Sequence, residues 1–151
     1  MNRRDALLMI SRGAATTLLP LRVGAGEQDV AAAIRNVFGD RPLRRGRITL
    51  KLPKLAESGN SVPIGVTIKS AMSRTDRVLR ACIFADRNPR PLIVTMLFGP
   101  NSGRAAFNTN IRLSGTQNVI AVAEMGDHSL WTSEARVLVT VGACDVLQTR
   151  Y

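Results

Sequence analysis

The sequence predicts an all-β protein, an antiparallel β-sandwich of about seven strands preceded by one short N-terminal helix. Three observations predict it. Segments rich in Val, Ile and Thr recur at roughly 8–12-residue intervals. Clusters of Gly, Pro, Asn, Asp and Ser separate these segments. Several segments alternate apolar and polar residues, which is typical of antiparallel sheets with one buried face. The 151 residues, 45% of them apolar, suffice for one domain with a core. We therefore expect an immunoglobulin-like sandwich rather than a barrel or an α/β fold.

Residues 1–25 have the composition of a bacterial export signal. They begin with the pair Arg3-Arg4, continue with apolar stretches that Arg12 interrupts, and end in small residues. The adjacent arginines indicate the twin-arginine type and hence the periplasm. An organellar transit peptide, or an amphipathic or disordered tail, is the alternative. The apolar stretches are too short and interrupted for a transmembrane helix, so we expect no membrane partner. Cleavage after Ala25 would lower the net charge from +10 to +7.

Residues 26–46 are predicted to form a helix and a basic linker. Between Glu27 and Phe38 the apolar residues recur at helical spacing, which predicts one amphipathic helix of about three turns. Asp29 is a candidate N-cap, and Gly39 is a candidate C-terminal stop. Residues 40–47 form the basic linker.

Residues 47–141 are predicted to form the sandwich. Val62, Ile64, Val66 and Ile68 share one face of their segment, as a half-buried strand requires. The seven predicted strands are Ile48–Leu52, Val62–Ser70, Val78–Phe84, Leu92–Phe98, Ala105–Leu113, Asn118–Met125 and Ala135–Val141.

A run of arginines in the linker invites a nucleic-acid hypothesis, which we reject. Aromatic residues make up only 4% of the chain, and none lies in the run, whereas proteins that bind single strands add aromatic side chains on which bases stack. We expect a solvated linker or a surface that attracts anions and acidic partners. The run consists of Arg41, Arg44, Arg45 and Arg47.

Cys144 is the strongest candidate for chemistry. It follows the last predicted strand after Gly142 and Ala143, which places its thiol outside the core on residues 142–151, a terminal arm. A thiol in that position suits a tethered nucleophile or a covalent carrier. The alternatives are a disulfide between Cys82 and Cys144, or a bystander thiol. The neighbouring Asp145 would raise the pKa of the thiol.

The other candidates have simpler interpretations. Cys82 lies inside a predicted strand and is expected to be a small buried apolar residue. His128 is expected to be a turn residue with no orienting partner, and Glu124 and Asp127 give no geometry for an acid–base pair. One His and two separated Cys cannot make a typical structural zinc site. We therefore expect neither an enzyme nor a metal protein.

From Arg47 to Cys144 the sequence carries a set of motifs in a specific order. These motifs resemble SoxY, the sulfur-carrying subunit of the bacterial thiosulfate-oxidising Sox system. They are Ile48-Thr-Leu-Lys-Leu-Pro53, Ala56-Glu-Ser-Gly-Asn-Ser-Val-Pro63, Ile83-Phe-Ala-Asp-Arg-Asn-Pro89, Thr116-Gln-Asn-Val119, Ala121-Val-Ala-Glu-Met-Gly-Asp127 and Ala135-Arg-Val-Leu-Val-Thr-Val-Gly-Ala-Cys144.

The resemblance implies a carrier that is acted on by partner enzymes and needs no cofactor. Family members are similar to immunoglobulin domains, pair with SoxZ, a second sandwich protein, and carry a cysteine on a C-terminal arm. A haem protein, SoxAX, couples thiosulfate oxidatively to that thiol. The hydrolase SoxB then releases sulfate, and a sulfur dehydrogenase oxidises the remaining sulfane sulfur. The resemblance assigns the covalent sulfur to Cys144 and the arm to Gly142, Ala143 and Asp145.

The arm departs from the family's usual Gly-Gly-Cys-Gly-Gly pattern. Ala143 and Asp145 replace glycines, and seven residues follow Cys144. Asp145 would repel an anionic sulfur compound and disfavour the thiolate. A second function therefore stays open: an exported, non-covalent interaction module, a divergent SoxY paralogue without sulfur carriage.

Overall fold

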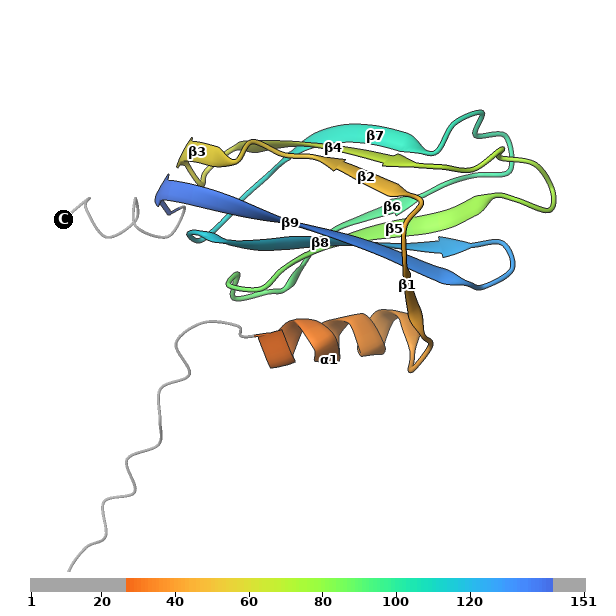
Figure 1. Cartoon of the computed structure of the whole chain (residues 1–151), viewed down its shortest axis with the longest axis horizontal. Coiled ribbons are helices and arrows are strands. Elements are labelled where there is room, and N and C mark those ends of the chain that lie inside the picture. The colour runs from red at the N-terminus through yellow and green to blue at the C-terminus, as the bar shows by residue number, and fades with distance from the viewer. Residues whose placement is uncertain (1–26, 143–151) are drawn as a thin grey trace, which may run out of the picture.

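A computed structural model describes residues 27–142 (Figure 1). This part of the chain forms three layers: one helix, a larger sheet and a smaller sheet. The elements in chain order are α1 (Glu27–Phe38), β1 (Leu43–Arg45), β2 (Ile48–Lys51), β3 (Leu55–Ser58), β4 (Val62–Ile68), β5 (Val78–Ala85), β6 (Leu92–Leu97), β7 (Ala106–Ile111), β8 (Gln117–Met125) and β9 (Leu130–Val141).

The long strand β9 pairs with three other strands, β1, β3 and β8. That sheet has the order β1-β9-β8-β5-β6, and β3 also pairs with β9, while the smaller sheet has the order β2-β4-β7. The first part of β9 lies between β8 and β1, and its last part, from Leu138 to Val141, pairs with β3. The pairs within β2-β4-β7 and within β9-β8-β5-β6 are antiparallel, whereas β1 and β3 run parallel to β9.

The predicted β-sandwich with an N-terminal helix is confirmed, with three differences. The helix and all seven predicted strands are present, but β9 begins at Leu130 rather than Ala135. The short strands β1 and β3 were not predicted, and they make the larger sheet mixed rather than purely antiparallel. All three residues of β1 are exposed, so their side chains carry no alternation to detect. Asp29, the candidate N-cap, lies inside the helix, whereas Gly39 ends it as predicted, with φ +75° and its N–H bonded to Arg35 O.

Alternate side chains of β5 and β8 are buried on opposite faces of the larger sheet. Ala81 and Ile83 point into the core between the sheets, whereas Cys82 and Phe84 point beneath α1. The smaller sheet contributes the predicted apolar face of β4, which is almost fully buried. Because each large buried side chain contributes about 1.5–3 kcal/mol, this central core is the main source of stability.

The helix covers the outer face of the larger sheet (Figure 1). Its apolar stripe includes Val30 and Phe38, which are 4% and 3% exposed. They pack with Phe84, Val122 and Leu130 in a second core. The helix is therefore fixed to the sandwich by its own apolar face. No helix within residues 27–142 is long and apolar enough to cross a membrane.

The arginine run of the linker makes contacts with the larger sheet. Arg45 pairs with Glu134, and Arg47 pairs with Asp76. The guanidinium groups of Arg44 and Arg47 lie 5.9 and 5.1 Å from the ring centroid of Trp131. Arg44, Arg45 and Arg47 are exposed, as a solvated linker requires. The segment nevertheless has a fixed course that the sequence did not predict, because β1 pairs in parallel with β9.

Candidate functional site

The end of β9, from which the predicted carrier arm continues, is held on both sides. On one side Gly59 N–H donates to Val141 O at 2.7 Å, and Leu138 N–H donates to Lys54 O at 2.9 Å. On the other side Val139 N–H donates to the Thr116 hydroxyl at 2.9 Å, and that hydroxyl donates to Val139 O at 3.3 Å. The chain therefore leaves the sandwich from a fixed point.

Gly142 is the one arm residue that the structure describes, and it is buried. Ala143, Cys144 and Asp145 lie outside the described residues. The described part of the chain ends with Gly142 at this end of the sandwich, which we call the arm end. It comprises the end of β9, the loop 86–91 and the segment 112–116.

Two loops of the arm end are tied together by Asn88, which belongs to the Asp-Arg-Asn-Pro motif. Its amide donates to Arg112 O at 2.8 Å, and its side-chain oxygen accepts from Ser114 N–H and Gln117 Nε2, both at 2.9 Å. Gln117 is 2% exposed and also accepts the N–H of Arg87 at 2.9 Å. We call these residues the amide clasp. A buried amide stabilises only when its groups are bonded, which this arrangement achieves.

A second connection joins the start of β8 to the end of β5. Asp86 accepts hydrogen bonds from the backbone N–H and the side-chain amide of Asn118, at 3.0 and 2.9 Å. The motifs around Asp86–Asn88 and Thr116–Asn118 are far apart in the sequence, yet they meet here. Their role is positional, because they fix the loops at this end of the sandwich rather than supply reacting groups. Sequence reasoning quoted these motifs but gave them no role.

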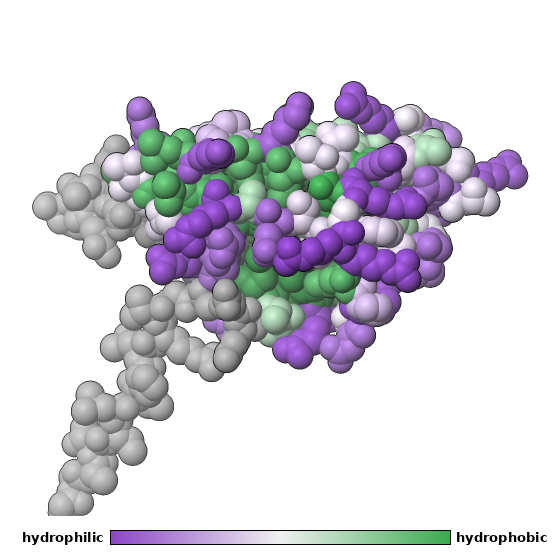
Figure 2. All heavy atoms as spheres, in the orientation of Figure 1, coloured by the Kyte–Doolittle hydropathy of each residue, from purple (hydrophilic) through white to green (hydrophobic). Residues whose placement is uncertain are grey.

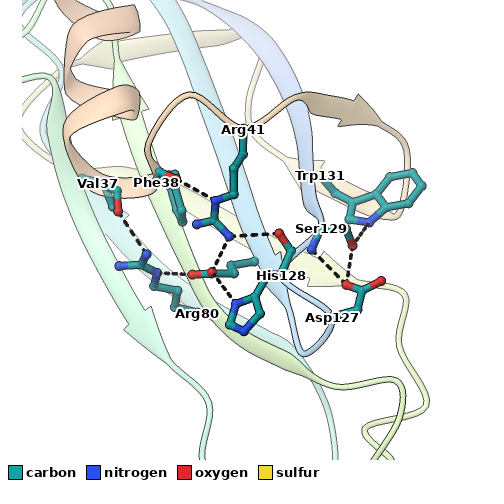
Figure 3. A network of polar contacts seen from close by, with 9 residues as sticks. Val37, Phe38, Arg41, Arg80, Asp127, His128, Ser129 and Trp131 are labelled. Atoms are coloured by element: carbon teal, nitrogen blue, oxygen red, sulfur yellow. Dashed lines mark hydrogen bonds and ion pairs between the residues drawn. The ribbon is translucent and has the colours of Figure 1, made fainter.

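The opposite end of the sandwich, the far end, holds a network centred on Glu124, whose partners Arg41, Arg80 and His128 are labelled in Figure 3. Its carboxylate, whose side chain is 8% exposed, accepts from Arg80 Nε at 2.7 Å and from a guanidinium nitrogen of Arg41 at 2.8 Å. His128 Nδ1 lies 3.2 Å away. Burial would raise the pKa of Glu124. The hydrogen bonds from Arg41, His128 and Arg80 outweigh burial and lower it from 4.5 to about 2.

This network clamps the end of α1 onto the sheet. Arg41 also donates to Phe38 O at 2.7 Å and to His128 O at 2.9 Å. Arg80 donates to Val37 O at 3.0 Å, and its guanidinium lies 4.6 Å from the Phe38 ring centroid. Three elements, α1, β5 and the β8–β9 turn, therefore meet on one carboxylate (Figure 3). A carboxylate engaged by so many donors serves structure rather than proton transfer.

The structure does not join Glu124 and Asp127 as an acid–base pair. Asp127 accepts from the N–H and hydroxyl of Ser129 at 2.9 and 2.6 Å, and these bonds lower its pKa. His128 is a turn residue as predicted, with φ 63°. It does have an orienting partner, the carboxylate of Glu124 four residues earlier, which sequence reasoning missed.

Cys82 is a buried apolar residue, as predicted. It is 0% exposed beneath α1, and its sulfur lies 3.6 Å from Thr95 Oγ1. Burial raises the pKa of its thiol, which makes it a poor nucleophile. Cys82 is a free cysteine, so the alternative of a disulfide between Cys82 and Cys144 was wrong. Residues 27–142 contain no group of three His, Cys, Asp or Glu side chains placed to bind a metal.

Comparison with known proteins identifies the family. The family described as "Sulfur oxidation protein SoxY" matches residues 34–144, which is more than half of the chain. The chain belongs to the SoxY family. The matched segment ends at the position of Cys144. No curated protein matches the chain.

Solved structures support the SoxY-like fold. The sulfur carrier protein SoxY from Chlorobium limicola f thiosulfatophilum aligns with a TM-score of 0.64 and 24% identity, over 76% of this chain and 98% of that chain. A superoxide reductase (neelaredoxin) from Ignicoccus hospitalis aligns with a TM-score of 0.56 and 11% identity, over 78% of this chain and 95% of that chain. A superoxide reductase from Nanoarchaeum equitans aligns with a TM-score of 0.54 and 13% identity, over 64% and 100%. At these identities the likeness concerns the fold alone.

Proposed function

We propose that this protein is a periplasmic sulfur carrier of thiosulfate oxidation, which holds sulfur intermediates covalently on Cys144 while partner enzymes act on them. Membership of the SoxY family supports the role, together with one observation that carries it. The last strand delivers the chain at Gly142 from a base bonded on both sides, and Cys144 follows two residues later. A fixed base and a short tether present one thiol in a defined region. The fully buried Cys82 has no such access.

The proposed cycle begins with the thiolate of Cys144, since only the thiolate attacks. It forms a sulfur–sulfur bond with thiosulfate, giving a cysteine S-thiosulfonate, and the released electron pair passes to a haem enzyme of the SoxAX type. Water then attacks the terminal sulfone in a hydrolase of the SoxB type. Sulfate and protons leave, and a persulfide remains on the cysteine. A sulfur dehydrogenase oxidises this sulfur, and the carrier itself performs none of these steps.

Residues 1–25 are proposed to export the protein through the twin-arginine route. The pair Arg3-Arg4 before an apolar stretch supports this part of the proposal. Replacing both arginines with lysine should leave the protein in the cytoplasmic fraction of fractionated cells. Export of the doubly substituted protein at the normal level would contradict it.

The partner is proposed to be a SoxZ-like β-sandwich, and the outer edge of β6 supports such a partner. Among the described strands β6 pairs with β5 alone, and its sequence, Leu92–Leu97, contains no charge and no proline. Sheet edges are usually protected by such residues, and Leu97 is 72% exposed. Leu97→Lys should weaken the heterodimer in size-exclusion chromatography, whereas Leu43→Lys, on another exposed leucine, should not. An unchanged heterodimer with Leu97→Lys would exclude this edge as the interface.

The direct test of sulfur carriage is intact-mass analysis of protein isolated from thiosulfate-grown cells. Wild-type protein and Cys82→Ala should both carry added sulfur or thiosulfonate mass, and Cys144→Ser should carry none. Thiosulfate oxidation should stop with Cys144→Ser and continue with Cys82→Ala. Oxidation at the wild-type rate with Cys144→Ser would refute the proposal.

Asp145 favours the second candidate, a non-covalent interaction module, because it places a negative charge beside the thiol where the family has glycine. The interaction-module hypothesis predicts that the protein still binds its partner when Cys144 is blocked or replaced. Thiol labelling of the native oxidised protein separates the two. A reactive Cys144 supports the carrier, and an unreactive Cys144 supports the interaction module; the buried Cys82 should be unreactive in either case.

A further inference from the structure

The smaller sheet carries a groove of about 980 Å³ on the face that points away from the larger sheet. The core face of β4 is buried, whereas Pro63, Gly65 and Thr67 alternate with it on this outer face. Because β4 lies between β2 and β7, its small residues form the floor, and the two neighbouring strands form the walls. We call this cavity the sheet groove, and its lining includes Lys51, Pro53, Pro63, Gly65, Asn108 and Asn110.

A glycine in the central strand brings the two walls together. Lys51 and Asn108 are the register partners of Gly65 on either side, and Asn110 is the partner of Pro63. A Cβ atom on Gly65 would lie 2.8 Å from Asn108 Oδ1 and 3.3 Å from the Cβ of Lys51. Only glycine therefore lets both side chains lie over β4. A glycine inside a strand often marks a close approach of this kind.

The polar groups of the sheet groove are not used by the fold. Lys51, Asn108 and Asn110 are all exposed. Within residues 27–142 the Lys51 ammonium forms no ion pair, and the amides of Asn108 and Asn110 form no hydrogen bond. An ammonium has three N–H donors, and each amide has two. The described residues that line the groove include no Asp or Glu. The groove thus combines one positive charge with several available donors.

An unpaired cation alone does not mark a site, because hydrophilic side chains are spread over much of the surface (Figure 2). Lys69 also forms no ion pair in the described part of the chain, and it lines a cavity of about 600 Å³. That cavity contains Asp76, whose pKa is lowered by hydrogen bonds from Ala71 N–H and from Arg47. The carboxylate would repel an anion beside Lys69. The sheet groove differs in having amide donors and no acidic residue among its described lining.

We propose that the sheet groove binds a small oxyanion, whose charged oxygen atoms accept hydrogen bonds from the Lys51 ammonium and from the side-chain amides of Asn108 and Asn110. A charged acceptor fits this donor set, because an ammonium can only donate. Hydrogen bonds to a charged group are roughly twice as strong as those between neutral groups. The inference goes beyond the proposed function, since it requires neither Cys144 nor the arm.

The test titrates the full-length Cys144→Ser protein, which cannot form adducts at this position, with sulfate, thiosulfate, inorganic phosphate or acetate at low salt. Amide NMR spectra follow the binding. The backbone signals of Gly65, Asn108 and Asn110 should shift and saturate. The anion with the lowest dissociation constant separates a tetrahedral oxyanion from a carboxylate as the preferred ligand.

Two variants, each with a matched control, assign the binding groups. Lys51→Gln should raise the dissociation constant by about tenfold or more, whereas Lys69→Gln, which removes the same charge beside Asp76, should stay within about twofold. Gly65→Ala should raise the dissociation constant by about fivefold, because the added methyl group displaces the Asn108 amide without changing the charge. Its control is Gly103→Ala, where an added Cβ has nothing within 4 Å. A circular dichroism melt shows that each variant is folded.

Every outcome decides the proposal. Saturable binding that Lys51→Gln and Gly65→Ala weaken, and that their controls leave unchanged, supports it. The proposal is overturned if none of the four anions binds saturably, if the shifts lie outside the sheet groove, or if a variant and its control weaken binding equally. Sulfur carriage is judged separately, by the adduct on the wild-type protein, so failure of one proposal is distinguishable from failure of the other.

Discussion

The Glu124 network makes the sharpest prediction about stability. Glu124→Gln keeps the shape of the side chain but removes the charge that Arg41, Arg80 and His128 share. A carboxyl whose pKa falls from 4.5 to about 2 on folding contributes about 3 kcal/mol at neutral pH by linkage. We therefore expect the variant to lose about 2–4 kcal/mol at pH 7, and the end of α1 to lose its fixed contact with the β8–β9 turn.

The pH dependence follows from the direction of the pKa change. The pKa of Glu124 is lower in the folded state, so its contribution is complete above about pH 4.5 and is lost as pH falls towards 2. Glutamine does not titrate. The difference in free energy of unfolding between wild type and Glu124→Gln should therefore be largest at pH 7 and shrink markedly by pH 3.

Urea unfolding at pH 7, 5 and 3, followed by circular dichroism, measures this difference. The matched control is Glu134→Gln. That carboxylate pairs with Arg45 at 3.4 Å, and their side chains are 56% and 84% exposed. Exposed pairs contribute about 0–1 kcal/mol, so the control should change little. Equal effects of the two variants, or an effect of Glu124→Gln that does not change with pH, would refute the assignment of a buried structural clamp.

Three further predictions test other parts of the molecule. Under native conditions a thiol reagent should label Cys144 but not Cys82, which is 0% exposed, and both should react in denaturant; native labelling of Cys82 would contradict its burial. Asn88→Ala removes three hydrogen bonds and should cost about 1–3 kcal/mol in urea unfolding while speeding amide hydrogen exchange around Gln117; unchanged exchange would mean that the clasp does not hold the loops. Phe38→Ala, on the buried face of α1 at 3% exposure, should cost about 3–5 kcal/mol; a loss smaller than about 1 kcal/mol would show that α1 adds little to the core.

Much of the fold could be predicted because its elements have a strong periodicity. The helix shows its apolar stripe in twelve residues, and the alternation in β4 matches its observed burial. The strands β1 and β3 could not be found in this way, because their three and four residues are mostly exposed and depend on β9 for pairing. Local pattern carries no information on such long-range pairing.

The candidate sites also differ in how far the sequence alone could predict them. Cys82 was correctly interpreted from its apolar neighbours, but its place beneath the helix rather than in the sandwich core required the structure. The contact of Arg41 with Glu124 joins residues 83 positions apart, and no spacing rule predicts it. The clasp around Asn88 and Gln117 is likewise assembled from separate loops. Asn88, Gln117 and Glu124 do lie within the motifs that carry the family resemblance, but the sequence alone did not show which contacts they make.

The way each end is held explains how one small sandwich can combine a stable body with an exposed positive surface. The far end uses Arg41, Arg80 and Glu124, whose ion pairs stabilise the fold. The arm end is held chiefly by amides and hydroxyls, those of Asn88, Gln117 and Thr116 among them, and these bonds leave its cations available. Neutral hydrogen bonds are not screened by salt, whereas attraction between exposed charges is largely screened beyond about 8 Å at physiological ionic strength. Raising the salt concentration should therefore weaken the exposed pair of Arg45 and Glu134 while leaving the base of the arm intact.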